Sequence, residues 1–386
     1  MHAVIAWSLV VVCSLWNAAG FLAVARAIRK RAGGNGSVKA ASEPVSVLKP
    51  LNGADDDLYQ NLHSFFEQDL PELQLVFGVA EQDDPAVSIV ARLQREYPTV
   101  ECVLVVHSDA SALNPKVQNL LGMLPHARHD LLLISDSNVR APRHYLRELV
   151  TLHARPNVGM VTNLFAGSAE RTLGAALENV QLNGFCAAGS ALPTLSGDAA
   201  VVGKSTLFSR AALDRLGGLS RLSCVLAEDF VLGKMFQNAG QRVLIAPTVL
   251  ETPNRDRTLR AAFSRQLRWS MLRWRLRPAV ALLEPLTSPL LMLPFAYRAF
   301  GHYAWLWFFA LLALRDLGGW VLLRGWGRAW LPLLLGPLRE LSAPAAWFIG
   351  LFKRHVSWQG RRLRLSAGTL LYAEPWAERR ASAEAR

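Results

Sequence analysis

Short apolar runs recur through the part of the chain before residue 279, and mixed or polar stretches separate them. The clearest run, 131–134, reads Leu-Leu-Leu-Ile and is typical of a strand buried on both faces of a sheet. The stretches between the runs carry apolar residues at helical spacing, for example Leu58, Leu62 and Phe65. Strands alternating with helices predict βαβ units and a parallel α/β sheet. The predicted strands are 45–49, 73–79, 100–106, 131–134, 158–161 and 242–245, and the later helices are 173–184, 228–238 and 258–275.

Longer apolar stretches at both ends of the chain predict membrane segments. Residues 3–25 contain no charged residue and are long enough to span a bilayer. Arg26, Arg29, Lys30 and Arg31 follow, so the positive-inside rule places the N-terminus outside and the main domain in the cytoplasm. The alternative, a cleaved signal peptide, is disfavoured because the positive charges follow the apolar stretch instead of preceding it. Residues 33–41 are interpreted as a polar linker.

Three further apolar segments, 285–300, 303–323 and 330–352, are candidates for membrane helices near the C-terminus. Arg315-Asp316 and Arg339-Glu340 interrupt two of them, so these charges must be paired, face protein or lie at an interface. Basic residues in 353–364 place the following tail in the cytoplasm. We therefore expect a multi-pass membrane protein with an even number of full spans.

Composition supports one soluble domain with membrane segments. The 386 residues are 51% hydrophobic, with a mean hydropathy of +0.19. The four cysteines have no Cys-x-x-Cys spacing, which disfavours a zinc site or a disulfide framework. The net charge of +12 is compatible with nucleic-acid binding. The apolar ends of the chain instead favour an anionic membrane surface or a phosphorylated substrate as the partner of these positive charges. We expect no nucleic-acid partner.

Asp136-Ser-Asn138 directly follows the most apolar run. In open α/β sheets, ligands bind outside the carboxyl ends of the strands. A carboxylate there could hold a hard cation for a nucleotide diphosphate. The alternative is that Asp136 caps the next helix, whose start Pro142 would mark. The residues alone leave both interpretations open.

Other charged groups follow the same pattern. Asp83-Asp84-Pro85 ends a strand, although Asp84 would also cap a helix with Pro85 at its first position. Glu228-Asp229 opens a helix, and its carboxylates could have no role beyond a favourable interaction with the helix dipole. The basic helix 258–275 contains Arg265-x-x-Arg268-Trp269 and could lie on a membrane surface. Residues 201–206 resemble a phosphate loop, but five residues separate Gly197 from Gly203, so this is no Walker A motif.

In this order the motifs resemble the family 2 glycosyltransferase pattern D, D, D, (Q/R)xxRW of the processive type. The chain is most similar to ceramide glucosyltransferases, a family 2/21 group, and among bacterial relatives to the glycosyltransferase of hopanoid biosynthesis. The resemblance covers nearly the whole chain. It also rests on Val45-Ser-Val-Leu-Lys-Pro-Leu51, Asn114-Pro-Lys116, Ala227-Glu-Asp-Phe230 and the tail motif Val356-Ser-Trp358-Gln-Gly-Arg361-Arg362-Leu-Arg364.

The resemblance implies a GT-A (Rossmann-like) fold and an inverting transfer from a UDP-sugar. Asp229 would be the general base, and Asp136 would hold Mg²⁺ or Mn²⁺. Asn138 stands where many GT-A enzymes have a second Asp, so its role as a ligand is doubtful. The implied nucleotide-sugar contacts are Asp83 and Asp84 for uridine, and Lys116, Asp136, Lys204, Glu228, Arg265, Arg268 and Trp269 around the diphosphate and acceptor entrance.

The expected acceptor is a membrane lipid. We predict a bacteriohopanetetrol-type hopanoid receiving N-acetylglucosamine, with ceramide receiving glucose as the alternative. A non-catalytic membrane scaffold on a degenerate transferase fold is the third alternative. The predicted domains are an anchor (1–31), a cytoplasmic GT-A domain (42–278), C-terminal membrane segments (279–354) and a cytoplasmic tail (355–386). The expected location is a bacterial inner membrane.

Overall fold

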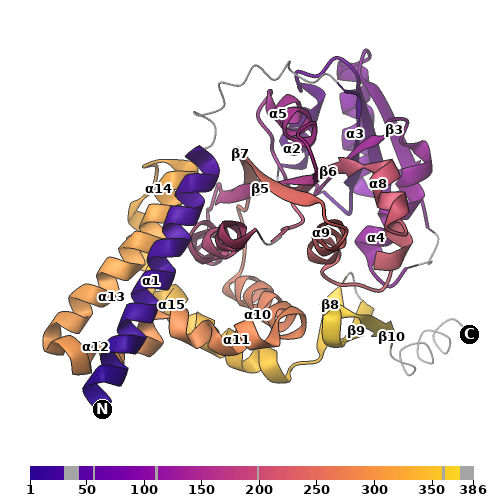
Figure 1. The fold of residues 1–386 in the computed structure, drawn as a ribbon. Coiled ribbons are helices and arrows are strands. Elements are labelled where there is room, and N and C mark those ends of the chain that lie inside the picture. The colour runs from indigo at the N-terminus through magenta and orange to yellow at the C-terminus, as the bar shows by residue number, and fades with distance from the viewer. Residues whose placement is uncertain (30–42, 55–56, 109–111, 198–199, 359–360, 374–386) are drawn as a thin grey trace, which may run out of the picture.

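A computed structural model describes residues 1–29, 43–54, 57–108, 112–197, 200–358 and 361–373. Figure 1 shows two parts: an α/β part built around a twisted sheet, and an elongated bundle of helices that leans away from it. The first helix and the helices between residues 289 and 352 form the bundle, so segments from opposite halves of the chain lie side by side. Lys30, Arg31, the predicted linker 33–41 and the last part of the predicted tail, 374–386, lie outside the described residues.

The sheet of the α/β part has seven strands within the described residues, in the order β3-β2-β1-β4-β6-β5-β7. Strands β1 to β4 run parallel, as do β5 and β7, which confirms this part of the sequence prediction. β6 is antiparallel to both neighbours, so the prediction of a purely parallel sheet is wrong there. The strands are β1 (Val45–Pro50), β2 (Leu73–Val79), β3 (Glu101–Val106), β4 (Leu131–Ser135), β5 (Val158–Ser168), β6 (Ser205–Ser209) and β7 (Arg242–Pro253).

Helices cover both faces of this sheet. Along β4, Leu131 and Leu133 join the core beneath α2, α3 and α5, whereas Leu132 and Ile134 join the core beneath α4, α8 and α9. The run 131–134 is therefore buried on both faces, as its unbroken apolar sequence predicts. The helices of the α/β part are α2 (Leu58–Phe66), α3 (Pro85–Glu96), α4 (Pro115–Met123), α5 (Tyr145–His153), α6 (Leu173–Gln181), α7 (Ala187–Ala191), α8 (Arg210–Arg215), α9 (Glu228–Asn238) and α10 (Leu259–Leu276), the last of which packs against α6 and α15.

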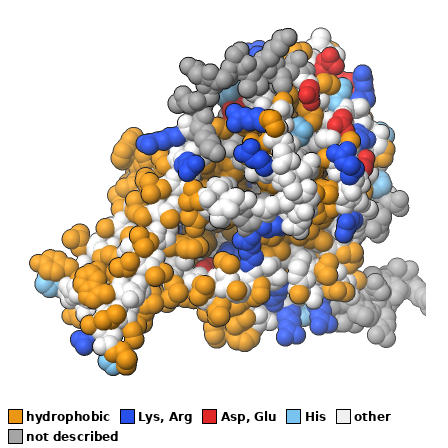
Figure 2. All heavy atoms as spheres, in the orientation of Figure 1, with side chains coloured by type: hydrophobic (Ala, Val, Ile, Leu, Met, Phe, Trp, Pro, Cys, Tyr) orange, Lys and Arg blue, Asp and Glu red, His pale blue; other side chains and the backbone are white. Residues whose placement is uncertain are grey.

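The helical bundle presents an apolar surface. In Figure 2, hydrophobic side chains cover most of its visible face, while Lys and Arg side chains gather over the α/β part. Among the described residues, two helical segments are long and apolar enough to cross a membrane, His2–Arg29 and Pro289–Arg324. Gly301, with φ +62°, bends the second segment at the boundary between the predicted segments 285–300 and 303–323. The bundle consists of α1 (His2–Arg29), α12 (Pro289–Phe300), α13 (Ala304–Leu312), α14 (Gly318–Arg324) and α15 (Trp330–Phe352), with α11 (Pro278–Leu283) leading into it.

Two π-helical turns join the α/β part to the bundle. The first, Leu182–Cys186, extends α6, and the second, Ala313–Leu317, lies between α13 and α14. A Cβ on Gly184 would come 2.4 Å from Asp316 Oδ1, and a Cβ on Gly319 would come 2.3 Å from the carbonyl oxygen of Asn183. Backbone therefore packs directly against backbone and carboxylate at this junction.

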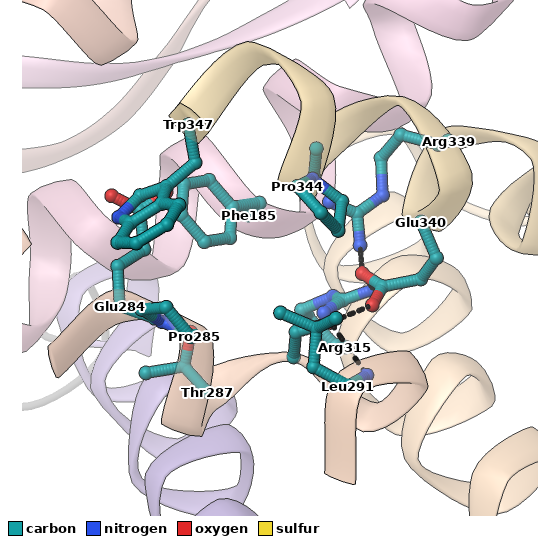
Figure 3. Close-up of a pocket in the computed structure, with 12 residues that line it drawn as sticks. Phe185, Glu284, Pro285, Thr287, Leu291, Arg315, Arg339, Glu340, Pro344 and Trp347 are labelled. Carbon is teal, nitrogen blue, oxygen red and sulfur yellow. Dashed lines mark hydrogen bonds and ion pairs between the residues drawn. The ribbon is translucent and has the colours of Figure 1, made fainter. Parts of the chain in front are cut away.

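The charges that interrupt the apolar segments pair with one another. Arg315 donates to both oxygens of Asp316 at 2.8 and 2.9 Å, and it lies 2.8 Å from Glu340 Oε1. Arg339 also binds Glu340 and donates to Gln181 Oε1 at 2.9 Å. Figure 3 shows Arg315, Arg339 and Glu340 converging at a cavity of about 20 Å³, which Phe185, Pro344 and Trp347 also line. We call Arg315, Asp316, Arg339 and Glu340 the membrane-side cluster.

The tail forms a small antiparallel sheet that the sequence analysis did not predict. Its strands are β8 (His355–Trp358), β9 (Arg361–Leu365) and β10 (Leu371–Ala373). Their apolar side chains form one cluster with Leu267 and Met271 of α10 and with Leu226. In Figure 1 this yellow sheet lies against α10, next to the α/β part. The described tail residues are therefore folded onto the α/β part.

Candidate active site

A small cavity lies beyond the carboxyl end of β4. Its volume is about 20 Å³, and its lining includes Lys116 from α4, Gly203 from the loop before β6, and Glu228 and Asp229 from the start of α9. These residues come from three separate parts of the chain, and the sheet brings them together. We call Lys116, Asp136, Lys204, Glu228 and Asp229 the catalytic cluster.

Two ammonium groups flank Asp136. Lys116 Nζ is 2.8 Å from Asp136 Oδ1, and Lys204 Nζ is 3.0 Å from Oδ2. Lys204 also donates to Asn138 Oδ1 at 2.8 Å, so the two residues of this motif share a cation. Burial alone would raise the pKa of the Asp136 carboxyl, but Lys116 and Lys204 hold it below its usual range. The capping interpretation of Asp136 is wrong, because α5 begins at Tyr145 and its N-cap is His144.

A third lysine, which sequence reasoning missed, lies behind Asp136. Lys49 is fully buried and donates to the carbonyl oxygen of Asp136 at 2.8 Å and to Ser135 Oγ at 3.1 Å. Burial lowers the pKa of Lys49 well below its usual value. In the sequence this lysine looks like a solvent-facing strand residue. Its environment depends on β4, which lies more than eighty residues away along the chain.

Asp229 differs from the other carboxylates of the catalytic cluster. Glu228 Oε1 lies 3.0 Å from Lys116 Nζ, but among the described residues no ion pair reaches Asp229. Instead the backbone N–H groups of Phe230 and Gly203 donate to its two oxygens, the first at 2.7 Å. Burial, and then the negative charge of Glu228, raise the pKa of the Asp229 carboxyl to about 6. A carboxylate poised this close to neutrality can accept a proton from a reacting hydroxyl.

Gly203 has a steric reason to be glycine. A Cβ at this position would lie 2.8 Å from Asp229 Cβ and Oδ2, closer than such contacts allow. Its carbonyl oxygen accepts from Lys116 Nζ at 3.1 Å, so this one residue contacts both the base candidate and a lysine. The motif at 201–206 thus contributes Lys204 and a close backbone approach to the site, and its last residues begin β6.

The Arg-rich motif lies on α10, which Thr258 caps at the predicted start. Arg265 forms an ion pair with Glu178 of α6 at 2.8 Å, and its guanidinium lies over the ring of Trp269. Burial, and then the charge of Arg265, lower the pKa of Arg268. Sequence reasoning missed Glu178, because only the packing of α6 against α10 reveals it as the partner of Arg265.

Asp83 and Asp84 lie at the same edge of the sheet as Asp136. They follow β2, Asp136 follows β4, and β1 lies between these two parallel strands, so the carboxyl ends of β2 and β4 are about 10 Å apart. Asp84 caps α3, since its Oδ1 accepts from Ala86 N at 2.8 Å, and its Oδ2 accepts from Gly53 N at 2.9 Å. Asp83 is exposed. Asp84 therefore shapes the loop at the end of β1, while the neighbouring carboxylate is open to solvent.

Comparison with known proteins adds the family. The family model described as glycosyl transferase family 21 matches residues 7–371. Ceramide glucosyltransferase 1 of Caenorhabditis elegans is 27% identical over 340 residues, which cover 84% of this chain and 72% of that protein. A ceramide glucosyltransferase of Candida albicans is 34% identical over 120 residues, 28% of this chain and 22% of that protein.

Among solved structures, a mannosyltransferase from Pyrobaculum calidifontis in complex with GDP-Man and Mn²⁺ superposes with a TM-score of 0.50. The two chains are 20% identical, and the match covers 91% of this chain and 99% of the other. At this level of identity the likeness concerns the fold, and it confirms the predicted GT-A-like architecture.

Proposed function

The chain belongs to glycosyl transferase family 21, and from this premise we propose that it transfers glucose from UDP-glucose to a hydroxyl of ceramide. That it is a glycosyltransferase follows from the family and from the related enzymes, and this excludes the scaffold alternative. The relatives reported above are ceramide glucosyltransferases, so they favour ceramide and UDP-glucose over the hopanoid and UDP-N-acetylglucosamine expected first from the sequence.

One observation carries the proposed mechanism: Asp229 is a partly buried carboxylate that two backbone N–H groups hold, with a raised pKa, beside a site rich in lysine. Asp229 accepts the proton of the acceptor hydroxyl, and the hydroxyl oxygen attacks the anomeric carbon. The bond from that carbon to the UDP oxygen breaks, and the electron pair leaves with UDP. This single displacement inverts the anomeric configuration.

Positive side chains stabilise the leaving diphosphate in this proposal. Lys116 and Lys204 surround Asp136, and Arg265 and Arg268 approach from α10. In a site with little water, such preplaced charges stabilise developing negative charge more strongly than bulk solvent does. Asp83, exposed in the loop after β2 at the same edge of the sheet, is the proposed contact for uridine.

We also propose that a divalent cation, Mg²⁺ or Mn²⁺, joins the donor diphosphate at Asp136. The described residues contain no group of three or more His, Cys, Asp or Glu side chains that could hold a metal. One carboxylate nevertheless fits Mg²⁺, which is commonly held by one or two carboxylates together with substrate phosphates. Asp136 would hold it, with the amide oxygen of Asn138 nearby, and the ion would supply charge neutralisation at the diphosphate. The mannosyltransferase named above contains Mn²⁺ in its complex.

The bundle is proposed to place this site beside a bilayer. Two helical segments of the described chain are long and apolar enough to span it, and the relatives act on a lipid, as their names state. We propose a multi-pass arrangement with the α/β part on the cytoplasmic side. A bacterial inner membrane is the proposed location, and it rests on the Arg-, Ala- and Leu-rich composition.

The test is UDP release by membranes containing the protein. UDP-glucose, UDP-galactose and UDP-N-acetylglucosamine are each offered with ceramide or bacteriohopanetetrol. We expect release with UDP-glucose and ceramide, loss of release in Asp229→Asn, and no loss in Asp214→Asn, which changes an exposed acid on α8. Release only with bacteriohopanetetrol and UDP-N-acetylglucosamine would overturn the ceramide proposal and restore the hopanoid prediction.

A further inference from the structure

The loop between β9 and β10 lies against the residues that lead into α9. Thr369 O accepts from Leu226 N at 2.9 Å, and Leu371 N donates to Cys224 O at 2.7 Å. Thr369 Oγ1 also accepts from Ala227 N at 3.3 Å. The C-terminal sheet thus adds a short antiparallel pairing to the segment that ends one residue before Glu228.

Thr369 occupies an unusual position for its residue type. It is fully buried, and its φ is +61°, directly after Gly368 with φ +63°. A β-branched residue rarely adopts a positive φ, because its side chain crowds the backbone there. Such strain persists only where the surrounding contacts enforce it. Here the enforcing contacts are the hydrogen bonds to Leu226 and Ala227.

The segment before α9 has no cap of its own. Its N-cap residue, Ala227, has no side chain that can accept a hydrogen bond from the first turn. On one side Asn114 Nδ2 donates to Val225 O at 2.6 Å and to Glu228 Oε2 at 3.3 Å. On the other side Thr369 accepts hydrogen bonds from the backbone N–H groups of Leu226 and Ala227. The segment is therefore held between Asn114 on one side and the tail on the other.

The same tail also packs on the helix that carries the Arg-rich motif. Val356, Leu363, Leu365 and Leu371 share one apolar cluster with Leu226 and with residues of α10. One small sheet therefore contacts both the segment before Asp229 and the helix with Arg265, Arg268 and Trp269. A shift of this sheet would move the base relative to these arginines.

We propose that Thr369 is a positioning residue for Asp229, and that the C-terminal sheet sets the base at its working distance from the acceptor. The inference rests on the proposed function, because it assumes that Asp229 takes a proton. Thr369 does not touch the substrate; it acts through Ala227 and Leu226, which fix the first turn of α9.

The test compares Thr369→Val, Thr369→Gly and Thr369→Ser in the full-length protein. Thr369→Val keeps the shape of the side chain but removes the hydroxyl that accepts from Ala227 N. Thr369→Gly also removes this hydroxyl, and glycine adopts the positive φ without strain, so this variant should still fold. We expect kcat to fall about tenfold in both, because loss of the hydrogen bond to Ala227 N lets the first turn of α9 move and misplaces Asp229, with the KM for the UDP-sugar unchanged. Thr369→Ser keeps the hydroxyl and should restore most of kcat.

Tyr372→Phe is the matched control, since Tyr372 lies on β10 and is half-exposed. Wild-type kcat in Thr369→Gly would overturn the proposal. So would a loss that comes with an equal rise in KM and a lower melting temperature, because that pattern indicates a merely structural role. If the wild type itself transfers no sugar but binds UDP, the proposed function fails; if the wild type is active and Thr369→Gly matches it, only the positioning role fails.

Discussion

The catalytic cluster and the membrane-side cluster each bring several charged side chains together, but they balance these charges differently. In the membrane-side cluster two arginines face two carboxylates, and every one of the four groups has an ionic partner. In the catalytic cluster two lysines face three carboxylates, and Asp229 is left with backbone N–H donors. A balanced buried cluster joins helices, whereas one unbalanced carboxylate retains a proton affinity useful for chemistry.

The largest expected effect tests the unbalanced carboxylate. Asp229→Asn keeps the shape and one of the two N–H contacts, because the amide has a single acceptor oxygen, but it cannot accept a proton. Because a positioned base contributes about 10²–10⁴-fold, we expect kcat to fall about 1,000-fold while UDP binding persists. Steady-state UDP release together with UDP titration measures both. Equal loss of binding and turnover would instead make Asp229 a donor-site residue.

The second prediction concerns a variant that removes one carboxylate from the membrane-side cluster. Glu340→Ala leaves Arg315 and Arg339 with fewer partners inside the bundle, and removing one partner of a buried pair costs about 3–5 kcal/mol. We expect a lower melting temperature in detergent, with the KM for UDP-glucose unchanged in the folded fraction. Glu72→Ala, at an exposed site, is the control. An unchanged melting temperature would contradict the structural role.

The third prediction concerns the cations of the catalytic cluster. Lys204→Met removes one of the two ammonium groups beside Asp136. We expect the KM for UDP-glucose to rise about tenfold, because the donor loses one hydrogen bond from a charged group. Lys234→Met, on α9 and bonded to Gln237, should leave this KM unchanged. If Lys204→Met lowers kcat alone, Lys204 acts in the transition state and not in donor binding.

The smallest expected effect is a shift in pH dependence. Asp229 must be deprotonated to act as base, so kcat should fall about tenfold per pH unit below a pH of about 6. Glu228→Gln removes the negative neighbour that is the second cause of the raised pKa, so the acidic limb should move to lower pH by less than about one unit. A profile of kcat against pH from 4.5 to 8 measures this shift. If the acidic limb does not move in Glu228→Gln, the group that titrates there is not Asp229.

Local patterns in the sequence were enough to predict much of this fold. The apolar run 131–134 predicted a buried strand, and its abrupt end predicted the place of Asp136, because carboxyl ends of parallel strands share one edge. The cap at Thr258 and the Pro85 start of α3 also depend only on neighbouring residues. Each of these features has a short-range physical cause.

The features that sequence reasoning missed depend on distant contacts. β6 carries Ser205, Thr206 and Ser209, which weaken its apolar signal, and it is recognisable only once β4 and β5 flank it. The Arg-rich β9 reads as a solvated basic tail until its leucines meet α10. The number of full membrane spans and the domain boundaries stay predictions.

The glycine contacts at the two π-helical turns have a consequence for engineering. Gly184 and Gly319 let the α/β part and the bundle approach to atomic contact, with Asp316 of the bundle against Gly184. A soluble fragment cut at residue 278 would uncover this contact surface, including Phe185 and the partners of the buried arginines. Likewise, a chimaera that joins this catalytic part to another enzyme's helices would place new side chains where none fit. The α/β part and the bundle therefore have complementary surfaces, and they should be kept together in any expressed fragment, chimaera or directed-evolution library.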